Sequence, residues 1–166
     1  HWMRQVDGVP GFIEEDASPS TMTLARLKAD SQDAVKDYPS LGPKEQEHAL
    51  GIALDYLRSA CEALIEEILF ADTIQRYDDH VRVQNLEEVG FSQPAALKIV
   101  ELHGRISEMM LAHNRSDVRK EGPPALTDLN AVRKDFDQLE SELKALHKAA
   151  REARDVRKKE RAAARA

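Results

Sequence analysis

Arg58 and Glu62 are the residues whose types and spacing best suit a chemical role. They lie four positions apart in the segment Leu54–Ile65, where apolar residues recur with helical periodicity, so both project from one face of a helix. Because aliphatic residues flank them, a buried pair is costly unless each charge is paired. The pair therefore has either a chemical role or a structural partner. The structural alternative is an intrahelical salt bridge at the edge of the core, which contributes about 0.3–0.5 kcal/mol when exposed.

His113 is the second candidate for chemistry. It ends the apolar stripe of a predicted helix over residues 93–114, just before a loop that contains prolines. An imidazole at the mouth of a crevice between helices can act as a general acid or base near neutral pH. The alternative is a histidine that interacts with the last carbonyls and the dipole of its own helix.

Other common chemistries lack their motifs. The sequence has no glycine-rich phosphate loop and no His-Glu-x-x-His pattern, so we expect no cofactor in this domain. The remaining histidines, His80 and His103 among them, show no ligand spacing, and we therefore expect no metal site. Cys61 is the only cysteine, and in this position a thiol most often behaves as a small apolar side chain.

The composition indicates one helical domain. The chain has 166 residues, of which 33% are charged and 5% aromatic, with seven glycines. This profile is typical of an all-α protein. A single cysteine fits a reducing compartment, and no apolar run reaches the ~20 residues of a membrane span. The sequence therefore predicts a cytoplasmic protein without a membrane partner.

Turn residues and apolar periodicity divide the chain into three parts. Residues 1–20 are predicted to be an expression-vector remnant followed by a linker or arm, and residues 148–166 a basic helical tail. Between them, residues 21–147 are predicted to form a helical bundle of about four main helices. Their expected spans are 21–37, 44–71, 93–114 and 127 to the C-terminus.

The last predicted helix carries a heptad seam. Its apolar residues recur in steps of three and four over nearly three heptads: Leu129, Val132, Phe136, Leu139, Leu143 and Leu146. Such a seam packs against the other helices of the chain or against a second copy. We expect packing within the chain for its first half, because a four-helix core needs a long closing helix.

The tail reverses the charge of the rest of the chain. Residues 148–166 contain eight Lys or Arg and three acids, whereas the whole chain has a net charge of −6. A basic tail of this kind binds nucleic acid or folds back on the acidic surface of its own chain. Lys and Arg also complement the dipole at a helix C-terminus.

Several segments resemble the C-terminal effector region of bacterial phage-defence ATPases of the AAA/ABC type, similar to the anticodon nucleases PrrC and RloC. The similar blocks are Leu57–Leu69, Ile74–Tyr77, Val81–Leu86 and Ile106–Asn114, followed after two prolines by Leu129 at the start of a long helix. The effector regions of those nucleases resemble the HEPN class of helical ribonucleases. The resemblance implies a HEPN-like helical bundle.

The resemblance also implies a catalytic set. HEPN ribonucleases use an Arg-x-x-x-Glu pair and a downstream histidine, which correspond here to Arg58, Glu62 and His113. The implied activity is a toxin-like endoribonuclease that cleaves tRNA-like RNA without metal and leaves a 2′,3′-cyclic phosphate. Arg115 and Arg119 are then expected to bind the RNA backbone.

The resemblance implies partners as well. These are RNA, a second copy of the chain in a homodimer, and a parent ATPase domain that would bind ATP or GTP. The first alternative is a non-catalytic dimerisation or partner-sensing module of the same antiviral defence ATPase. A second alternative is a DNA-directed role for the basic tail.

Overall fold

The computed structural model describes residues 22–75, 80–114 and 124–165, with the backbone alone at 112–114. Within these residues helices are the only regular secondary structure, as predicted, and no strand occurs. The elements are α1 (Leu24–Asp33), a 3-10 turn η2 (Tyr38–Ser40), α2 (Pro43–Leu64), a π-helical turn η3 (Ile65–Leu69), a 3-10 helix η4 (Val83–Glu88), α3 (Gln93–Asn114) and α4 (Leu126–Ala163). The predicted arm at residues 1–20 lies outside the described residues.

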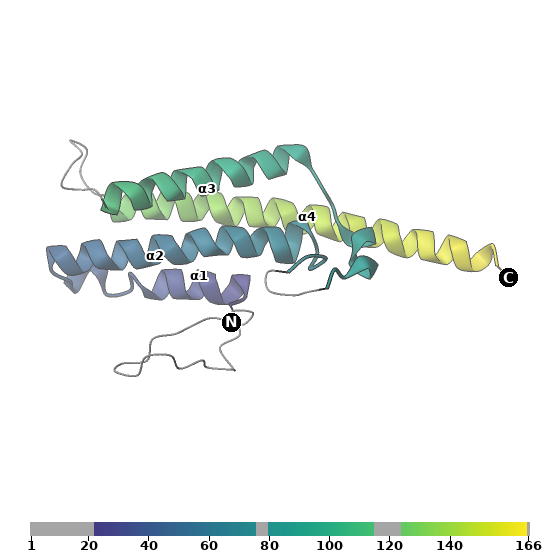
Figure 1. Cartoon of the computed structure of the whole chain (residues 1–166), viewed down its shortest axis with the longest axis horizontal. Helices are drawn as coiled ribbons and strands as arrows, with labels where there is room; N and C mark the ends of the chain where they lie inside the picture. The colour runs from purple at the N-terminus through teal and green to yellow at the C-terminus, as the bar shows by residue number, and fades with distance from the viewer. Residues whose placement is uncertain (1–21, 76–79, 115–123, 166) are drawn as a thin grey trace.

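The four long helices alternate in direction and form a bundle (Figure 1). α2 packs against α1, α3 and α4, and α3 also packs against α4. The bundle of about four main helices with a long C-terminal helix is therefore confirmed. Because consecutive helices are antiparallel, the end of α3 lies beside the first half of α2.

Local sequence signals explain where the first two helices begin and end. Thr23 caps α1, since its hydroxyl accepts a hydrogen bond from the Arg26 amide at 3.3 Å. α1 is shorter than predicted: it stops at Asp33, and turns lead into Pro39, which disfavours a helical residue before it. Pro43 then occupies the first position of α2, as expected.

The end of the second helix also differs from its predicted span. α2 ends at Leu64 and continues as the π-helical turn, in which the Phe70 amide donates to the Ile65 carbonyl at 2.9 Å. Ala71 and Asp72 then take positive φ values of 51° and 55°. Left-handed residues end a helix because they turn the chain away from its axis. The helix thus stops before the short segment that leads to η4.

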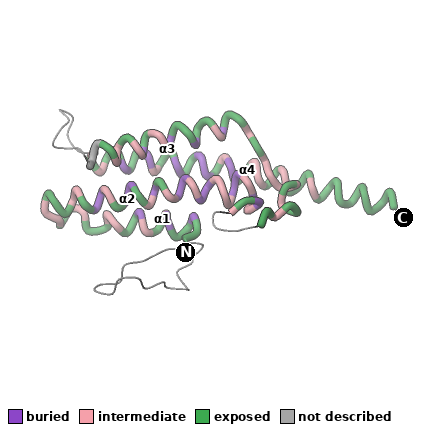
Figure 2. Tube along the Cα trace, viewed as in Figure 1, coloured by how far each residue is buried: buried purple, intermediate pink, exposed green. Residues whose placement is uncertain are grey.

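α4 closes the bundle with its first half and projects with its second. The heptad seam is buried from Leu129 to Leu143 and half-buried at Leu146, which confirms packing within the chain. Asp128 caps the start of the helix by accepting the Ala125 amide at 2.8 Å. Beyond residue 150 nearly every side chain is exposed (Figure 2). The helix runs without a break across the predicted boundary between bundle and tail.

A polar network fastens α1 to α4 beside the core. Lys28 contacts Asp137 at 2.7 Å and the buried carboxylate of Glu140, and Lys144 contacts the same carboxylate at 2.6 Å. Burial disfavours the charged form of Glu140, but the hydrogen bonds and charges of the two lysines outweigh burial and hold its pKa below the ordinary value. Glu140 therefore keeps its negative charge between the two lysines although its side chain is buried.

A second polar link joins three helices. Arg133 of α4 donates to the carbonyl of Ser31 in α1 and to its hydroxyl at 3.0 Å. The Ser31 hydroxyl in turn donates to the Ala53 carbonyl of α2 at 2.8 Å. Ser31 is buried, so the link satisfies polar groups that would otherwise lie unpaired in the core.

None of the described helices combines the length and apolar character that a membrane crossing needs.

Glu140→Gln is expected to lower the free energy of unfolding at pH 7 by about 1–3 kcal/mol, because two lysines lose a charged acceptor. The folded-state pKa of Glu140 lies below its ordinary 4.5, so the carboxylate stabilises the fold fully above that value and loses this effect as pH falls through the folded pKa. Between about pH 6 and about pH 3 the wild type should therefore lose more stability than the variant. Thermal melts measure both, and equal losses would contradict this account.

Gly90→Ala is expected to destabilise the fold by about 1–3 kcal/mol, because a Cβ there would lie 2.8 Å from the Leu146 carbonyl oxygen of α4. Backbone atoms cannot move away as a flexible side chain can. Gly42→Ala is the control, since its Cβ would lie 3.5 Å from the Glu45 carboxylate, an ordinary contact. Urea unfolding measures both variants, and equal stability of the two would contradict the packing at Gly90.

Candidate functional site

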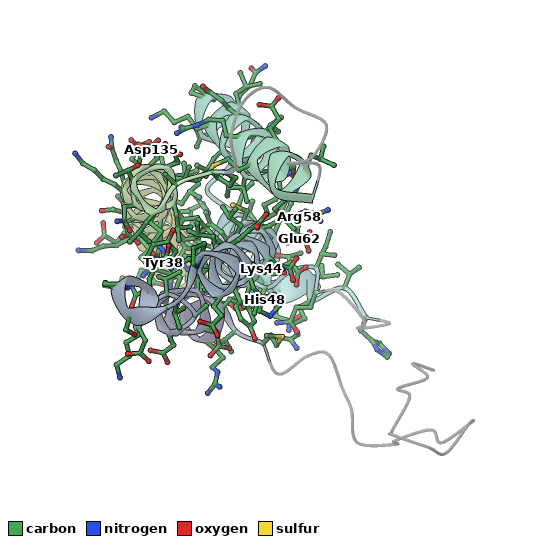
Figure 3. The ribbon with its side chains drawn as sticks, turned by 90° about the vertical axis from the view of Figure 1, so that its left-hand side faces the viewer. Tyr38, Lys44, His48, Arg58, Glu62 and Asp135 are labelled. Atoms are coloured by element: carbon green, nitrogen blue, oxygen red, sulfur yellow. The ribbon has the colours of Figure 1, made fainter. Side chains whose placement is uncertain are left out.

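Arg58 and Glu62 lie on the side of α2 that faces away from α4 (Figure 3). The sequence interpretation placed the pair within an apolar helix face, and this placement is wrong for Arg58, which is exposed, whereas Glu62 is half-buried. The neighbouring Leu54 and Cys61 are fully buried. The reason is that α2 packs against three helices, so its apolar face is wide and the charged residues lie along its edge.

The exposed face of α2 carries charges of both signs. Residues at this spacing share one helix face, and five polar side chains line it: Lys44, His48, Asp55, Arg58 and Glu62. Because positive and negative side chains alternate on this face, it does not create a strong positive field that would attract a polyanion. A ligand that binds here would be held by contacts with individual side chains.

The contact that defines the candidate site joins α2 to α3. Arg58 Nε donates to His103 Nε2 at 3.5 Å, a long hydrogen bond between side chains 45 residues apart. Nε2 can accept a hydrogen bond only in the imidazole tautomer that carries its proton on Nδ1, which leaves the Nε2 lone pair facing Arg58. His103 is half-buried, and its carbonyl accepts the Ser107 hydroxyl at 2.8 Å within the same helix. The geometry thus places a base beside a fixed positive charge at the protein surface.

His113 lies ten residues beyond His103 in α3, which corresponds to about 15 Å along the helix axis. The backbone of His113 is helical, as predicted, and its side chain lies outside the described part. Arg115 and Arg119, predicted to bind RNA, also lie outside the described residues. The contact of Arg58 is with His103, for which the sequence alone suggested no role beyond metal ligation. The available signal was the position of His103 next to Leu102 in the apolar stripe of α3.

Cys61 lies one turn from Arg58 but inside the core. Burial, with a smaller effect from the charge of Glu62, raises the pKa of the thiol to about 12. A thiol with this pKa is protonated at neutral pH and is a poor nucleophile. Cys61 therefore packs as a small apolar side chain, in line with the sequence interpretation.

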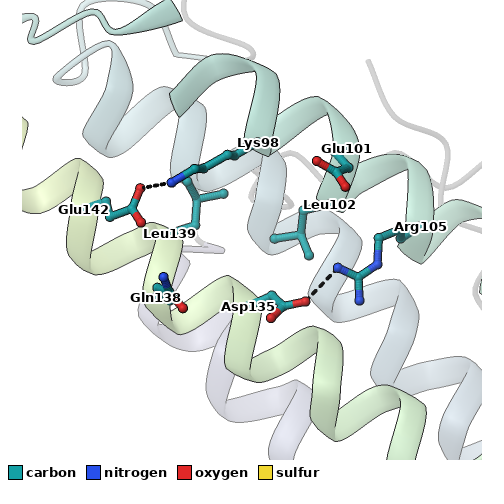
Figure 4. Close-up of a pocket in the computed structure, with 8 residues that line it drawn as sticks. All are labelled: Lys98, Glu101, Leu102, Arg105, Asp135, Gln138, Leu139 and Glu142. Carbon is teal, nitrogen blue, oxygen red and sulfur yellow. Dashed lines mark hydrogen bonds and ion pairs between the residues drawn. The ribbon is translucent and has the colours of Figure 1, made fainter. Parts of the chain in front are cut away.

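A groove between α3 and α4 is lined by two ion pairs (Figure 4). Lys98 contacts Glu142 at 2.6 Å, and Arg105 contacts Asp135 at 2.6 Å. Leu102 and its neighbour Leu139 form the apolar floor. Each charge in these pairs is balanced by its partner on the other helix, so the two ion pairs hold α3 on α4. Neither pair offers an unpaired base or nucleophile.

Part of the basic tail, as a straight continuation of α4, contacts acidic residues of η4. Glu88 contacts Arg154 and, at 3.3 Å, Arg151, while Arg161 contacts Glu87 at 3.2 Å. Arg157 also donates to the Glu87 carbonyl at 3.5 Å. Of the alternatives for the tail, these contacts support the one in which it pairs with the acidic surface of its own chain.

In the described part of the chain, no group of three or more His, Cys, Asp or Glu side chains is arranged to hold a metal ion.

Native Cys61 is expected to react with a thiol reagent at pH 8 at least about 100-fold more slowly than the unfolded protein does in urea, because the thiol is buried and protonated. Absorbance of a disulfide-exchange reagent follows the reaction. The matched reference is an exposed thiol introduced by Ser141→Cys on α4. Comparable rates for the two thiols in the folded protein would contradict the burial of Cys61.

Comparisons with protein-family models, curated proteins and solved structures found no match to this chain. The resemblance to the anticodon nucleases and to HEPN ribonucleases therefore rests on the residues quoted for it. The contact between Arg58 and His103 is the main structural guide to function.

Proposed function

We propose that this chain is a metal-independent endoribonuclease domain, HEPN-like in fold, that acts as the effector of a bacterial anti-phage defence ATPase. The observation that carries the proposal is the contact of Arg58 Nε with His103 Nε2, at an exposed surface and one helical turn from Glu62. A base that takes the 2′-hydroxyl proton and a cation that stabilises charge on the phosphoryl oxygens both promote the cleavage of RNA by its own 2′-hydroxyl.

The reaction uses these side chains in separate roles. His103 Nε2 takes the proton of a ribose 2′-hydroxyl, and the 2′-oxygen forms a bond to the adjacent phosphorus. The bond from phosphorus to the 5′-oxygen breaks, this oxygen takes a proton from solvent, and a 2′,3′-cyclic phosphate remains. Arg58 stabilises the charge that develops on the phosphoryl oxygens, and Glu62 orients the guanidinium.

Substrate binding would also free the base. In the structure Arg58 occupies the lone pair of His103 Nε2 through a contact of 3.5 Å, near the upper limit for a hydrogen bond. A phosphate offers the guanidinium shorter, charge-assisted and bidentate hydrogen bonds. RNA would therefore draw Arg58 away from the imidazole and leave Nε2 ready to accept a proton.

The remaining partners follow from the resemblance. Unpaired loop bases, as in a tRNA anticodon loop, are the accessible target for a site on the protein surface, and Arg115 and Arg119 would bind the backbone. ATP or GTP would bind the parent ATPase, which would control when the effector cuts.

A non-catalytic dimerisation module of the same ATPase is the second candidate. The observation that favours it is the exposed apolar face of α3, which includes Leu97, Val100 and Leu111. An apolar surface of this kind is typical of a protein interface.

Purified protein incubated with bacterial tRNA in EDTA is expected to give discrete fragments with cyclic-phosphate ends. Arg58→Ala and His103→Ala should each reduce the cleavage rate by about 10²–10⁴-fold, because they remove the charge stabiliser and the base. Gel electrophoresis of end-labelled RNA measures the rate. Asp55→Asn is the matched control, since Asp55 is exposed on the same face of α2 and has no role in the reaction.

His113→Ala decides between the two histidines. Loss of cleavage in His103→Ala with activity retained in His113→Ala supports the site described here. The reverse pattern would assign the base to His113, as the sequence analysis predicted, and would contradict the role of His103. Intact RNA with every variant, and with the wild type joined to its ATPase, would leave the dimerisation module as the function.

A further inference from the structure

The outward face of α3 is apolar and uncovered. Leu97, Val100 and Leu111 are 62%, 70% and 49% exposed, which is high for large aliphatic side chains. At 100° per residue they fall on one side of the helix, together with Gly104, and opposite the buried Leu102. α3 packs on α2 and α4 with its other sides. Figure 2 shows this exposed edge of the bundle.

Gly104 lies at the middle of this face. A Cβ at Gly104 would meet no atom within 4 Å, so packing against the described residues does not explain a glycine there. Glycine in a helix interior is unfavourable, but it lets another backbone approach closely. The position is therefore suited to a helix that crosses α3 from outside the chain.

The charges beside the apolar face identify which helix fits. Along one flank the signs alternate, in the order Lys98, Glu101, Arg105 and Glu108. If a second α3 runs antiparallel with its centre near residue 103, Lys98 lies opposite Glu108 and Glu101 lies opposite Arg105. Both pairs join opposite charges. The flank is thus complementary to itself.

The apolar residues have a similar symmetry, with a centre one residue further along α3. An antiparallel pair centred on Gly104 places Leu97 opposite Leu111 and glycine opposite glycine. In a two-fold arrangement of antiparallel helices, residues on one flank meet the same flank of the partner, so the charge and apolar patterns agree. Lys98 and Arg105 already contact α4 but remain partly exposed, whereas Glu101 and Glu108 have no partner among the described residues.

We propose that the outward face of α3 binds the same face of a second copy of this chain, antiparallel, with the two-fold axis near Gly104. The interface is isologous: each Leu97 packs on the partner's Leu111, and the two flanks together form four ion pairs, in which Lys98 and Arg105 are shared between α4 and the second copy. The proposal does not depend on ribonuclease activity, and its tests measure association alone.

Cross-linking tests the antiparallel register. Leu97→Cys and Leu111→Cys each add one exposed thiol, while native Cys61 stays buried and unreactive. With a size tag on one variant, a short bis-maleimide is expected to link the two variants to each other far more than either to itself. Linking of Leu97→Cys mainly to itself would overturn the antiparallel arrangement. Yields no higher than those of Val83→Cys, an exposed position on η4, would overturn the interface.

Sedimentation equilibrium tests the affinity. Val100→Glu is expected to raise the dimer dissociation constant at least about tenfold, because it places a charge in the apolar stripe. Val83→Glu makes the same change at a residue that is similarly exposed and lies outside α3, and it should leave the constant unchanged. A wild type that sediments as a monomer at about 100 μM, or equal effects of the two variants, would overturn the proposal. Circular dichroism confirms that each variant is folded.

Discussion

The structure depends on the burial of α2 by three other helices. Small residues make this packing possible, because Ala53 and Ala60 have no exposed surface and allow neighbouring helices to approach closely. The wide apolar face that results leaves only a narrow polar edge. That edge carries Arg58, so the position of the candidate site is a consequence of how α2 is packed.

Packing on α2 also decides which faces of the other helices stay free. α3 uses one side for α2 and another for α4, and the ion pairs of Lys98 and Arg105 hold it on α4. Its third side is left apolar and exposed. α4 extends beyond the bundle, where Arg154 and its neighbours pair with η4 and neutralise part of the basic tail. The surface of the protein thus has three distinct regions: the polar edge of α2, the apolar outward face of α3 and the basic tail of α4.

Helices were predictable from the sequence where strong local signals bound them. α3 has the predicted bounds because its start carries a local signal: the Ser92 hydroxyl accepts the Ala95 amide at 3.5 Å, and a proline follows in the first turn. The heptad seam of α4 is buried as expected. The contact of Arg58 with His103 was not predictable, because periodicity defines the face of a helix but not the axial alignment of two helices. The exposure of Arg58, by contrast, was open to prediction, because the polar residues Lys44, His48 and Asp55 share its helix face by spacing.

The central claim is that Arg58 and His103 form one phosphate-binding, base-bearing site, and imidazole NMR tests it most directly. A dinucleotide with a 2′-deoxy sugar cannot be cleaved but offers the same phosphate. On its addition, the account predicts a shift of the His103 Nε2 resonance as Arg58 leaves the imidazole for the phosphate, and no such shift in Arg58→Ala. An unchanged His103 resonance at saturating ligand, or an equal shift without Arg58, would contradict the claim.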